Sequence, residues 1–445
     1  MTPQDLAAWD RPGPRYTSYP TVPLWKPIER SDIAQALSGL SEQAQVYVHL
    51  PFCAEQCSFC GCTQVVAGRQ SAGDKYLDAL QAQVENLELP AQRVPVQRIH
   101  LGGGTPTWMD LPQLERLHSI LMSRFDPQPG AELSVEGDPQ ITTIEQLELL
   151  TEQGYRRLSL GVQSFHDQVL QAVHRPQLVD RVPLLLEKAR SLGWTGLNLD
   201  LMYGLPYQQP EVLRRDLEHA VDLQPDRVAV FGYAHVPWIR RHQRRINEAT
   251  LPGTMARAES ALIAQEVFTE AGYVAIGMDH FAKADDALAI AQAKGELTRN
   301  FMGYMPGPQA DMIGLGVSSI SQVQGTFWQQ SSRLAPWQRE ALGGSLEPER
   351  GWVSSGEDLL REWCIAELMC HMRLDADRLR ERFSVEFKDH FADAVDGLQD
   401  LVHAGLVQVD AHGVQVKEEG RPLLRLAAAP FDAWRGGGAR YSRAV

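Results

Sequence analysis

Four of the six cysteines in this 445-residue chain lie in one short segment, CAEQCSFCGC. Cys53, Cys57 and Cys60 follow a C-x3-C-x2-C spacing, and Cys62 follows two residues later. Three thiolates on one loop suit three corners of an iron–sulfur cube and leave the fourth iron without a protein ligand. An open iron can bind a substrate or cofactor as well as transfer electrons. The spacing therefore predicts a [4Fe–4S] cluster with one open iron.

Two other uses of clustered cysteines fit this loop less well. A structural zinc site usually combines two such ligands with two more far along the chain. The remaining cysteines, Cys364 and Cys370, have no partner His at zinc-finger spacing, and we expect them to be small core residues of one helix. The N-terminus does not resemble a signal peptide. We therefore expect a cytoplasmic protein, in which clustered cysteines more often bind metal than form disulfides.

Residues at other predicted strand ends could bind a small charged ligand. The glycines of Gly102–Pro106 (GGGTP) allow a ligand to touch the backbone, although such a segment is often only a turn. Glu136 and Asp200 could bind an amine or ribose hydroxyls, or could serve as helix N-caps. Gln163 offers an amide, and Arg175 could pair with a carboxylate. These positions are candidates for a ligand site beside the cysteine loop.

Net charge limits the kinds of partner. At −14 the chain is acidic, which argues against nucleic acid, because phosphate binding needs a basic face. An anionic substrate would therefore need a local basic pocket. One basic run could attract substrate carboxylates but is more typical of a solvated helix face, and it consists of Arg240, Arg241, Arg244 and Arg245. No apolar run approaches the ~18 residues of a transmembrane helix, so no membrane association is expected.

Alternating strands and helices would bring these candidates together. Six short apolar runs are each followed by turn residues and helical periodicity: Val46–Leu50, Arg98–Leu101, Glu132–Val135, Arg157–Val162, Leu197–Met202 and Arg227–Val230. This pattern predicts parallel β/α units, and the lack of polar alternation predicts a sheet covered on both faces. The candidate motifs all follow strand ends, where β/α barrels form their active sites. The predicted fold class is α/β, a partial (β/α)6 TIM-like barrel.

The two ends of the chain differ from the barrel. Residues 1–40 contain RPGPRYTSYPTVPLWKP, which is too rich in Pro and aromatic residues for a helix, and we expect an N-terminal strap. Residues 41–342 would form the barrel with an extension, and Gly343–Gly356 would be a linker. Residues 357–445 are expected to form a smaller, mainly helical C-terminal domain. Its hairpin, LVQVDAHGVQVK, would have a His-Gly turn.

Taken together, the motifs resemble those of the oxygen-independent coproporphyrinogen III oxidases, which are radical S-adenosylmethionine (SAM) enzymes. The likeness extends almost from end to end, through RPGPRYTSYPT, YVHLPFCAEQCSFCGC, LGGGTPT, EGDP, GVQSF, NLDLMYGLP, YAHVP, IGMDHFAKADDALA, GLGVSSIS and YSRAV. It implies that Cys53, Cys57 and Cys60 hold the cluster and that SAM chelates the open iron. It also implies that Cys62 is a functional cysteine that does not ligate the cluster.

The resemblance further implies two SAM molecules. The positions that match the first SAM site are Tyr47, Gly103, Glu136 and Ile320. Those that match the second are Phe59, Gly104, Thr105, Gln163, Arg175, Asp200 and Ala234. In the implied reaction, a radical derived from SAM takes a hydrogen from a propionate of coproporphyrinogen III, and loss of CO2 and an electron leaves a vinyl group. Two propionates react, which gives protoporphyrinogen IX in anaerobic haem biosynthesis.

One motif departs from the family pattern. The chain reads NFMGYMP where NFQGYTT is expected, so Met302 and Met305 replace polar residues in a region associated with the tetrapyrrole. This change could weaken a substrate contact or indicate a radical SAM enzyme that acts on another tetrapyrrole. A haem-binding chaperone is a further alternative, against which Cys62 and the YTSYPT motif argue. We expect a monomer that receives electrons from a separate donor.

The strap could contact the substrate. Its donors and aromatic faces suit propionate carboxylates and a pyrrole rim, and they are Arg11, Arg15, Tyr16 and Tyr19. Alternatively the strap only covers apolar surface. If it binds substrate, deletion of the residues before Pro20 is expected to spare folding and the cluster but abolish decarboxylation.

Overall fold

Six parallel strands form the centre of the computed structural model, and each contains one of the six predicted apolar runs. They are β1 (Ala44–Leu50), β4 (Val94–Gly103), β5 (Phe125–Gly137), β6 (Arg157–Gln163), β7 (Gly196–Tyr203) and β8 (Arg227–Gly232). Neighbours in this order pair in parallel, which confirms the predicted partial (β/α)6 barrel.

The structure describes residues 1–42, 44–89, 93–175, 180–435 and 441–443. Pro176 and Gln177 of the HRPQ motif, and Ala444 and Val445 of YSRAV, lie outside the described residues.

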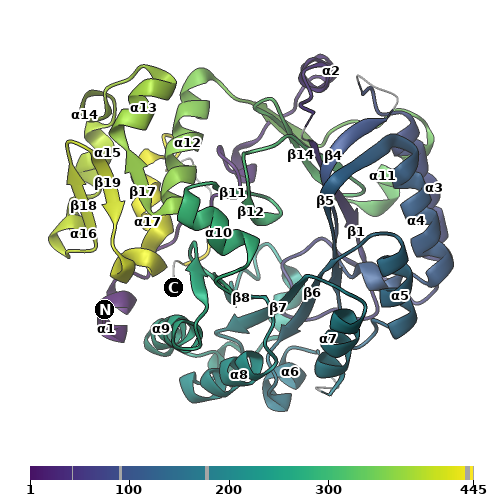
Figure 1. The fold of residues 1–445 in the computed structure, drawn as a ribbon, viewed down its shortest axis with the longest axis horizontal. Helices are drawn as coiled ribbons and strands as arrows, with labels where there is room; N and C mark the ends of the chain where they lie inside the picture. Colours follow the sequence, from purple (N-terminus) through teal and green to yellow (C-terminus); the bar gives the residue numbers. More distant parts are fainter. Residues whose placement is uncertain (43, 90–92, 176–179, 436–440, 444–445) are drawn as a thin grey trace.

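Helices cover the outer face of the sheet (Figure 1). They connect successive strands and are α3 (Ser71–Glu85), α4 (Leu111–Arg124), α5 (Ile144–Glu152), α6 (Asp167–Ala172), α7 (Arg181–Ser191), α8 (Pro210–Asp222) and α9 (Thr254–Glu270). α4 and α5 begin at side-chain caps, because Asp110 and Thr143 accept hydrogen bonds from backbone N–H groups of the first turn. The largest apolar core lies between these helices and the strands.

The two faces of the sheet differ. The prediction that the sheet is covered on both faces holds for the outer face, on which the helices pack, whereas the inner face lines a cavity. In β6, Leu160 and Val162 are fully buried in the core behind the strands. The alternate residues Arg157, Ser159 and Gly161 instead line a cavity on the inner face. Polar residues are tolerated there because the inner face encloses a cavity instead of a second apolar layer.

Six further strands extend the sheet at both edges. Beyond β1 lie β13 (Met312–Leu315), which is parallel to β1, and the antiparallel strands β14 (Ile320–Val323), β15 (Thr326–Gln329) and β16 (Arg350–Val353). Beyond β8 lie β10 (His280–Ala282) and β9 (Val274–Ile276). The sheet therefore continues into the segment predicted as a linker.

A smaller, mainly helical lobe begins with α12 (Gly356–His371) and is drawn in yellow and light green in Figure 1. Its remaining elements are β17 (Arg373–Asp375), α13 (Ala376–Phe383), α14 (Phe387–His390), α15 (Ala392–Gly397), α16 (Gln399–His403), β18 (Val407–Asp410), β19 (Gly413–Val416) and α17 (Leu424–Ala428). The predicted hairpin is present, but Asp410 pairs with Gly413, so its turn residues are Ala411 and His412 instead of His-Gly.

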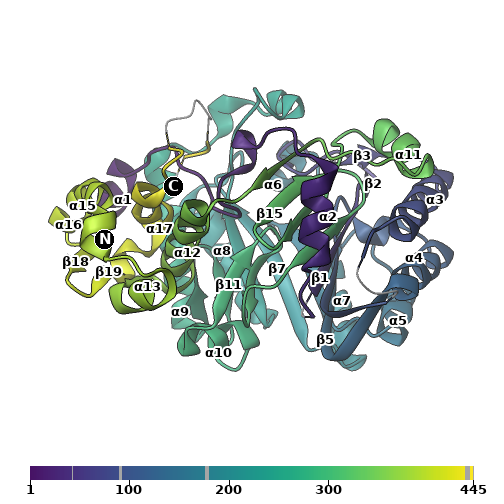
Figure 2. The ribbon, with the colours of Figure 1, turned by 90° about the horizontal axis from the view of Figure 1, so that it is seen from above.

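The N-terminal segment connects the two lobes. Helix α1 (Pro3–Ala8) lies beside α9 at the smaller lobe, and α2 (Arg30–Ser38) lies against β15 (Figures 1 and 2). Between them the chain has no α-helix, as predicted, and only one 3-10 turn at Val22–Leu24. Within the described residues, no helix has the length and apolarity needed to cross a membrane.

Candidate active site

The cysteine loop lies at the carboxyl ends of the barrel strands and lines a cavity of about 620 Å³. Contacts from distant segments fix the loop. The backbone N–H of Ser58 donates to the carbonyl of Val173 at 2.8 Å. Gln243 Nε2 donates to the carbonyl of Phe59 at 2.9 Å, and His242 Nε2 lies 2.7 Å from the carbonyl of Cys60. These contacts tie the loop to the segments that follow β6 and β8.

All four loop cysteines line the cavity, so the donor set fits the predicted cluster. Cys53 Sγ lies 3.5 Å from the hydroxyl of Thr105, and the guanidinium of Arg175 donates to Cys57 Sγ at 3.3 Å. Within the described residues, no three His, Cys, Asp or Glu side chains are close enough together to hold one metal ion.

Cys62 supports Cys60. Its backbone N–H lies 3.4 Å from Cys60 Sγ, and a hydrogen bond from its thiol is the largest influence that lowers the pKa of Cys60 to about 7. Donors stabilise the thiolate form of Cys60. By contrast, burial raises the pKa of Cys53 to about 11. The predicted non-ligand cysteine thus has a definite contact with a predicted ligand.

Glu136 is held at the end of β5. One carboxylate oxygen accepts from the backbone N–H of Gly103 at 3.0 Å, and the other lies 3.2 Å from His100 Nε2. Burial by itself would raise the pKa of Glu136, but the hydrogen bonds from His100 and Gly103 leave it lowered. Glu136 therefore presents a fixed, charged carboxylate to the cavity.

The pKa of Asp200 is shifted in the opposite direction to that of Glu136. It accepts from Ser159 Oγ and Asn198 Nδ2, both at 2.8 Å, yet burial raises its pKa. The two strand-end carboxylates therefore differ in electrostatic character, although both line the same cavity.

The glycines after β4 are required by close packing. A Cβ at Gly104 would lie 2.6 Å from the backbone carbonyl of Pro51, and a Cβ at Gly103 would lie 2.7 Å from the ring of His49. Gly103 also has φ of +115°, which disfavours a side chain. The GGGTP turn therefore fits tightly under the loop that carries the cysteines.

Gln163 and Arg175 both line the cavity, the first at an irregular strand end and the second in a network of polar contacts. Gln163 has φ of +71° and follows a β-bulge, which turns its amide at the strand end. Arg175 pairs with Asp138 at 3.2 Å and donates to the carbonyl of Gly161. Its Nε is buried and has no hydrogen-bond partner among the described residues. A carboxylate of a bound ligand would satisfy this donor.

Most predicted cofactor residues gather around this cavity. Besides the cysteines, the lining includes Phe59, Gly103, Gly104, Thr105, Glu136, Gln163, Arg175 and Asp200. Tyr47, Ile320 and Ala234 do not belong to it. The hydroxyl of Tyr47 lies 3.0 Å from His49 Nδ1, Ile320 begins strand β14, and the carbonyl of Ala234 accepts from Gln243.

The predicted substrate residues separate into two groups. Met302 lines the cavity, together with Met305. Arg15 donates to the carbonyl of Gly232 at 3.0 Å, at the end of β8. Arg11 is over half exposed and lies 3.8 Å from Asp400. The contact of these residues with substrate stays a prediction.

Tyr16 and Tyr19 lie elsewhere, because both are buried in the core of the smaller lobe. Tyr16 donates to Asp432 at 3.2 Å, and the hydroxyl of Tyr19 accepts from the backbone N–H of Ala433 at 3.1 Å. For these two tyrosines the structure favours the packing alternative.

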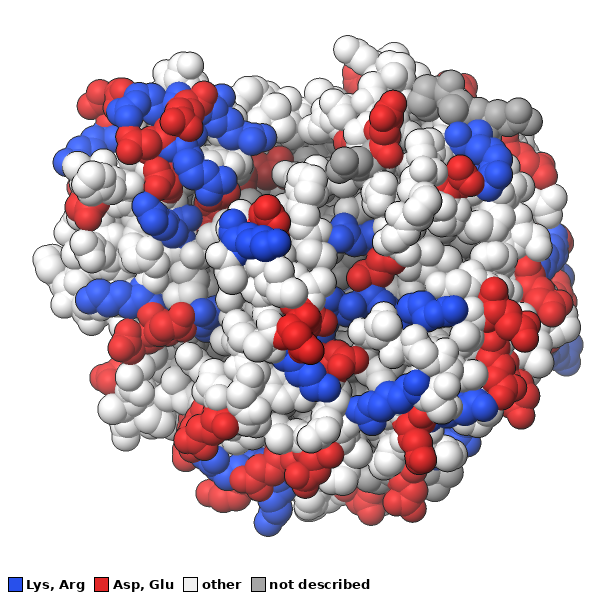
Figure 3. Space-filling model, in the orientation of Figure 1, with Lys and Arg blue, Asp and Glu red and all other residues white. Residues whose placement is uncertain are grey.

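The arginine run after β8 lies over the cysteine loop. It includes a 3-10 helix at Arg241–Arg245, whose His242 and Gln243 make the loop contacts described above. Arg241, Arg244 and Arg245 are exposed, which agrees with a solvated face. Over the face shown in Figure 3, acidic and basic side chains are interspersed and form no broad patch of one sign.

Several residues around the cavity were not singled out from the sequence. His100 and Asp138 hold Glu136 and Arg175, and Arg98, Arg157 and Arg227 line the cavity farther from the cysteines. The available signal was alternation at every second position, as in Arg98 and His100. The apolar residues between them, such as Ile99, dominate the pattern and mask this alternation.

Comparison with known proteins gives the following matches. Residues 47–220 match the model of the radical SAM superfamily, and residues 355–423 match that of the HemN C-terminal domain. The chain is 39% identical over 428 residues to an oxygen-independent coproporphyrinogen III oxidase from Salmonella typhimurium, which covers 95% of this chain and 93% of the relative. Identity to the protein of the same name from Pseudomonas aeruginosa is 37% over 436 residues, with 96% and 95% covered.

A solved structure is also similar over nearly its whole length. The coproporphyrinogen III oxidase (HemN) from Escherichia coli, described as a radical SAM enzyme, superposes with a TM-score of 0.90 at 37% identity. The match covers 94% of this chain and 97% of that structure.

Proposed function

Since this chain belongs to the oxygen-independent coproporphyrinogen III oxidase family, we propose that it decarboxylates two propionates of coproporphyrinogen III to vinyl groups, giving protoporphyrinogen IX. The observation that carries the proposal is the 39% identity that extends over 95% of the chain. The cavity supports it, since the cysteine loop and the strand-end carboxylates face one enclosed space. As a radical SAM protein, the chain uses a [4Fe–4S] cluster and SAM.

Cys53, Cys57 and Cys60 would hold the cluster. When bound, the cluster and SAM supply the electron and the radical that remove a hydrogen from the substrate. The protein itself positions the loop, through Thr105 at Cys53 and Arg175 at Cys57. Cys62 donates toward Cys60 and so stabilises the charge on that thiolate. These contacts would hold the three thiolates in fixed places.

Two groups of residues would receive SAM. For the first molecule, Glu136 and Gly103 present a carboxylate and a tight backbone turn at the end of the cysteine loop. A second SAM molecule would meet Arg175, Gln163 and Asp200 on the neighbouring strands. The Nε of Arg175, which has no hydrogen-bond partner in the described part of the chain, supports this second site, because a SAM carboxylate would satisfy it.

A monomeric state, a cytoplasmic location and a separate electron donor stay predictions. Met302 and Met305 lie in the cavity lining, so the choice of tetrapyrrole also has to be tested directly.

An anaerobic assay tests the proposed function. Reconstituted protein is incubated with SAM, a reductant and coproporphyrinogen III, and the products are separated by chromatography. We expect methionine, 5′-deoxyadenosine and protoporphyrinogen IX, with the monovinyl product at intermediate times. If SAM is cleaved but no vinyl product forms, the substrate assignment fails, and the same assay with other porphyrinogens identifies the alternative.

A further inference from the structure

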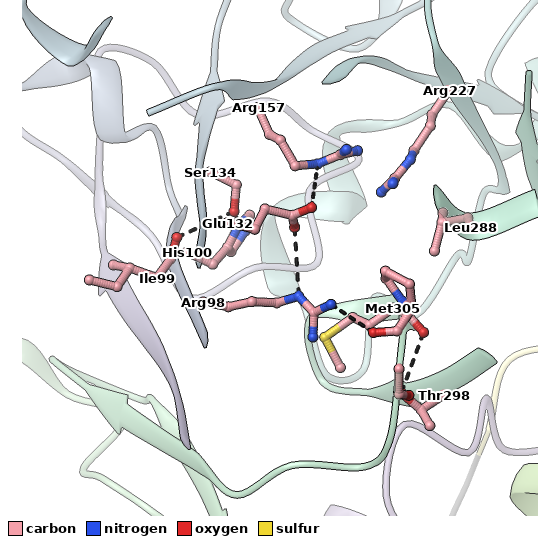
Figure 4. Close-up of polar contacts among 12 residues, drawn as sticks. Arg98, Ile99, His100, Glu132, Ser134, Arg157, Arg227, Leu288, Thr298 and Met305 are labelled. Carbon is pink, nitrogen blue, oxygen red and sulfur yellow. Dashed lines mark hydrogen bonds and ion pairs between the residues drawn. The ribbon is translucent and has the colours of Figure 1, made fainter. Parts of the chain in front are cut away.

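Three arginines and a glutamate lie on the inner face of the barrel, toward the amino-terminal ends of the strands (Figure 4). Arg98 of β4, Glu132 of β5, Arg157 of β6 and Arg227 of β8 all line the main cavity, and we call them the arginine layer. Gly103 lies five positions after Arg98 on β4, which corresponds to roughly 16 Å at about 3.3 Å per residue. The layer therefore lies at the opposite end of the cavity from the cysteine loop.

The pairing within the layer is incomplete. Glu132 lies between two arginines, with one oxygen 3.2 Å from Arg157 Nε and the other 3.8 Å from Arg98 Nε. Arg227 Nε donates to both oxygens of Asp286, at 2.8 and 2.9 Å. Three guanidinium groups thus share two carboxylates, which leaves one excess positive charge at this end of the cavity.

Buried donors in the layer also lack acceptors. Arg98 Nε and Arg227 Nη2 are buried and have no hydrogen-bond partner among the described residues. The side chain of Arg227 is only 9% exposed. A buried, unpaired donor on a charged group costs free energy that an anionic ligand would recover. Burial lowers the pKa of Arg227, and repulsion from Arg157 lowers it further. Both effects disfavour the charged guanidinium in the absence of a nearby anion.

The surroundings of the layer suit a carboxylate on an aliphatic arm. Figure 4 shows the guanidinium groups of Arg157 and Arg227 converging from different strands, with Leu288 near Arg227 and Met305 beside Arg98. Gly196 leaves room for this arrangement, because a Cβ there would lie 2.4 Å from Arg157 Nη1. Guanidinium donors next to apolar side chains can bind a carboxylate and the methylene groups that carry it.

We propose that the arginine layer binds propionate carboxylates of the tetrapyrrole that are not reacting, so that the macrocycle extends along the barrel with one propionate at the cysteine loop. This inference rests on the proposed function, in which the substrate carries four propionates and reacts at one of them at a time. The layer would then be the local basic pocket that an acidic protein needs for an anionic substrate. It would also orient the reacting edge of the ring.

Equilibrium binding to the reconstituted enzyme tests the inference. The probe is coproporphyrin III, the stable oxidised form with the same four carboxylates, and its fluorescence reports the dissociation constant. Arg98→Gln and Arg157→Gln should each weaken binding about tenfold, as for loss of a hydrogen bond to a charged group. Glu132→Gln should tighten binding, because it removes the competing carboxylate. Arg98→Lys and Arg157→Lys, which keep the charge, should recover part of the loss.

Matched controls separate carboxylate binding from structural damage. Arg93→Gln removes the same charge at an exposed position, where Arg93 pairs with Asp126 outside the cavity, and should leave the dissociation constant unchanged. The tetramethyl ester of coproporphyrin III should bind wild-type enzyme and Arg157→Gln equally. Arg227 is not varied because its loss would leave Asp286 buried and unpaired.

The outcomes distinguish this inference from the proposed function. If Arg98→Gln, Arg157→Gln and Glu132→Gln all lower the melting temperature while the dissociation constants stay at the wild-type value, the layer is only a structural ion network. If wild-type enzyme converts coproporphyrinogen III and the variants bind coproporphyrin III normally, the inference fails alone. If wild-type enzyme converts none, yet binds coproporphyrin III through these arginines, the layer is supported and the proposed reaction fails.

Discussion

Removal of the residues before Pro20 should destabilise the smaller lobe, contrary to the expectation from sequence that this deletion spares folding. Leu6, Tyr16 and Tyr19 are 0%, 6% and 1% exposed, and all three belong to the apolar core of that lobe. Burial of each side chain stabilises by about 2 kcal/mol, so the deletion should cost up to about 6 kcal/mol. That loss is comparable with the whole stability of a typical domain.

A point variant gives a more specific estimate of the free energy of unfolding that the strap contributes. Tyr19→Ala should cost about 4 kcal/mol, as for removal of a buried aromatic ring, and it would also leave the N–H of Ala433 without its acceptor. Tyr19→Phe removes only the hydroxyl and should cost about 1 kcal/mol. Arg11→Ala, at an exposed ion pair 3.8 Å long, is the matched control and should change stability by less than about 0.5 kcal/mol.

Hydrogen exchange measured by mass spectrometry localises the effect. Peptides from α12 and α17 should exchange faster in the truncated protein and in Tyr19→Ala, while peptides from β4 to β7 should not change. Chemical denaturation gives the free energies. Wild-type exchange in α12 and α17 after truncation would refute the reasoning, because it would mean that the buried strap contributes nothing to the lobe.

Three further predictions concern the cluster, the glycine turn and a half-buried glutamate. Cys53→Ala should remove the iron–sulfur absorbance, whereas Cys62→Ala should retain it; loss of iron only in the second variant would reverse the ligand assignment. Gly104→Ala should lower the melting temperature and the iron content, since its Cβ would lie 2.6 Å from the backbone of Pro51. Burial raises the pKa of Glu362 to about 7, above its ordinary value of 4.5. The stability that protonated Glu362 provides below pH 4.5 is therefore lost as pH rises through 7. The melting temperature of Glu362→Gln should accordingly rise relative to that of wild type between pH 4.5 and 7. A difference in melting temperature that does not change with pH would contradict this prediction.

The sequence by itself determined the features that depend on neighbouring residues. The six barrel strands were predicted because each combines an apolar run with the turn and helix that follow it. The cysteine loop was recognised from spacing within one segment, and Glu136, Gln163 and Asp200 from their places at strand ends. The family resemblance seen in these motifs is confirmed by the end-to-end identity.

Only the tertiary structure decided which side of each strand faces the cavity and which distant segments meet. Tyr16 bonds Asp432 across 416 residues, and no local pattern indicates that pairing. The six strands outside the barrel, β9, β10 and β13 to β16, join the sheet through partners in other parts of the chain. The arginine layer forms because Arg98 and Glu132 are register partners on β4 and β5, and because β6 and β8 bring Arg157 and Arg227 to the same cavity. An isolated arginine in a strand shows its charge in the sequence, but whether that charge is solvated, paired or available to a ligand depends on the neighbours that folding brings to it.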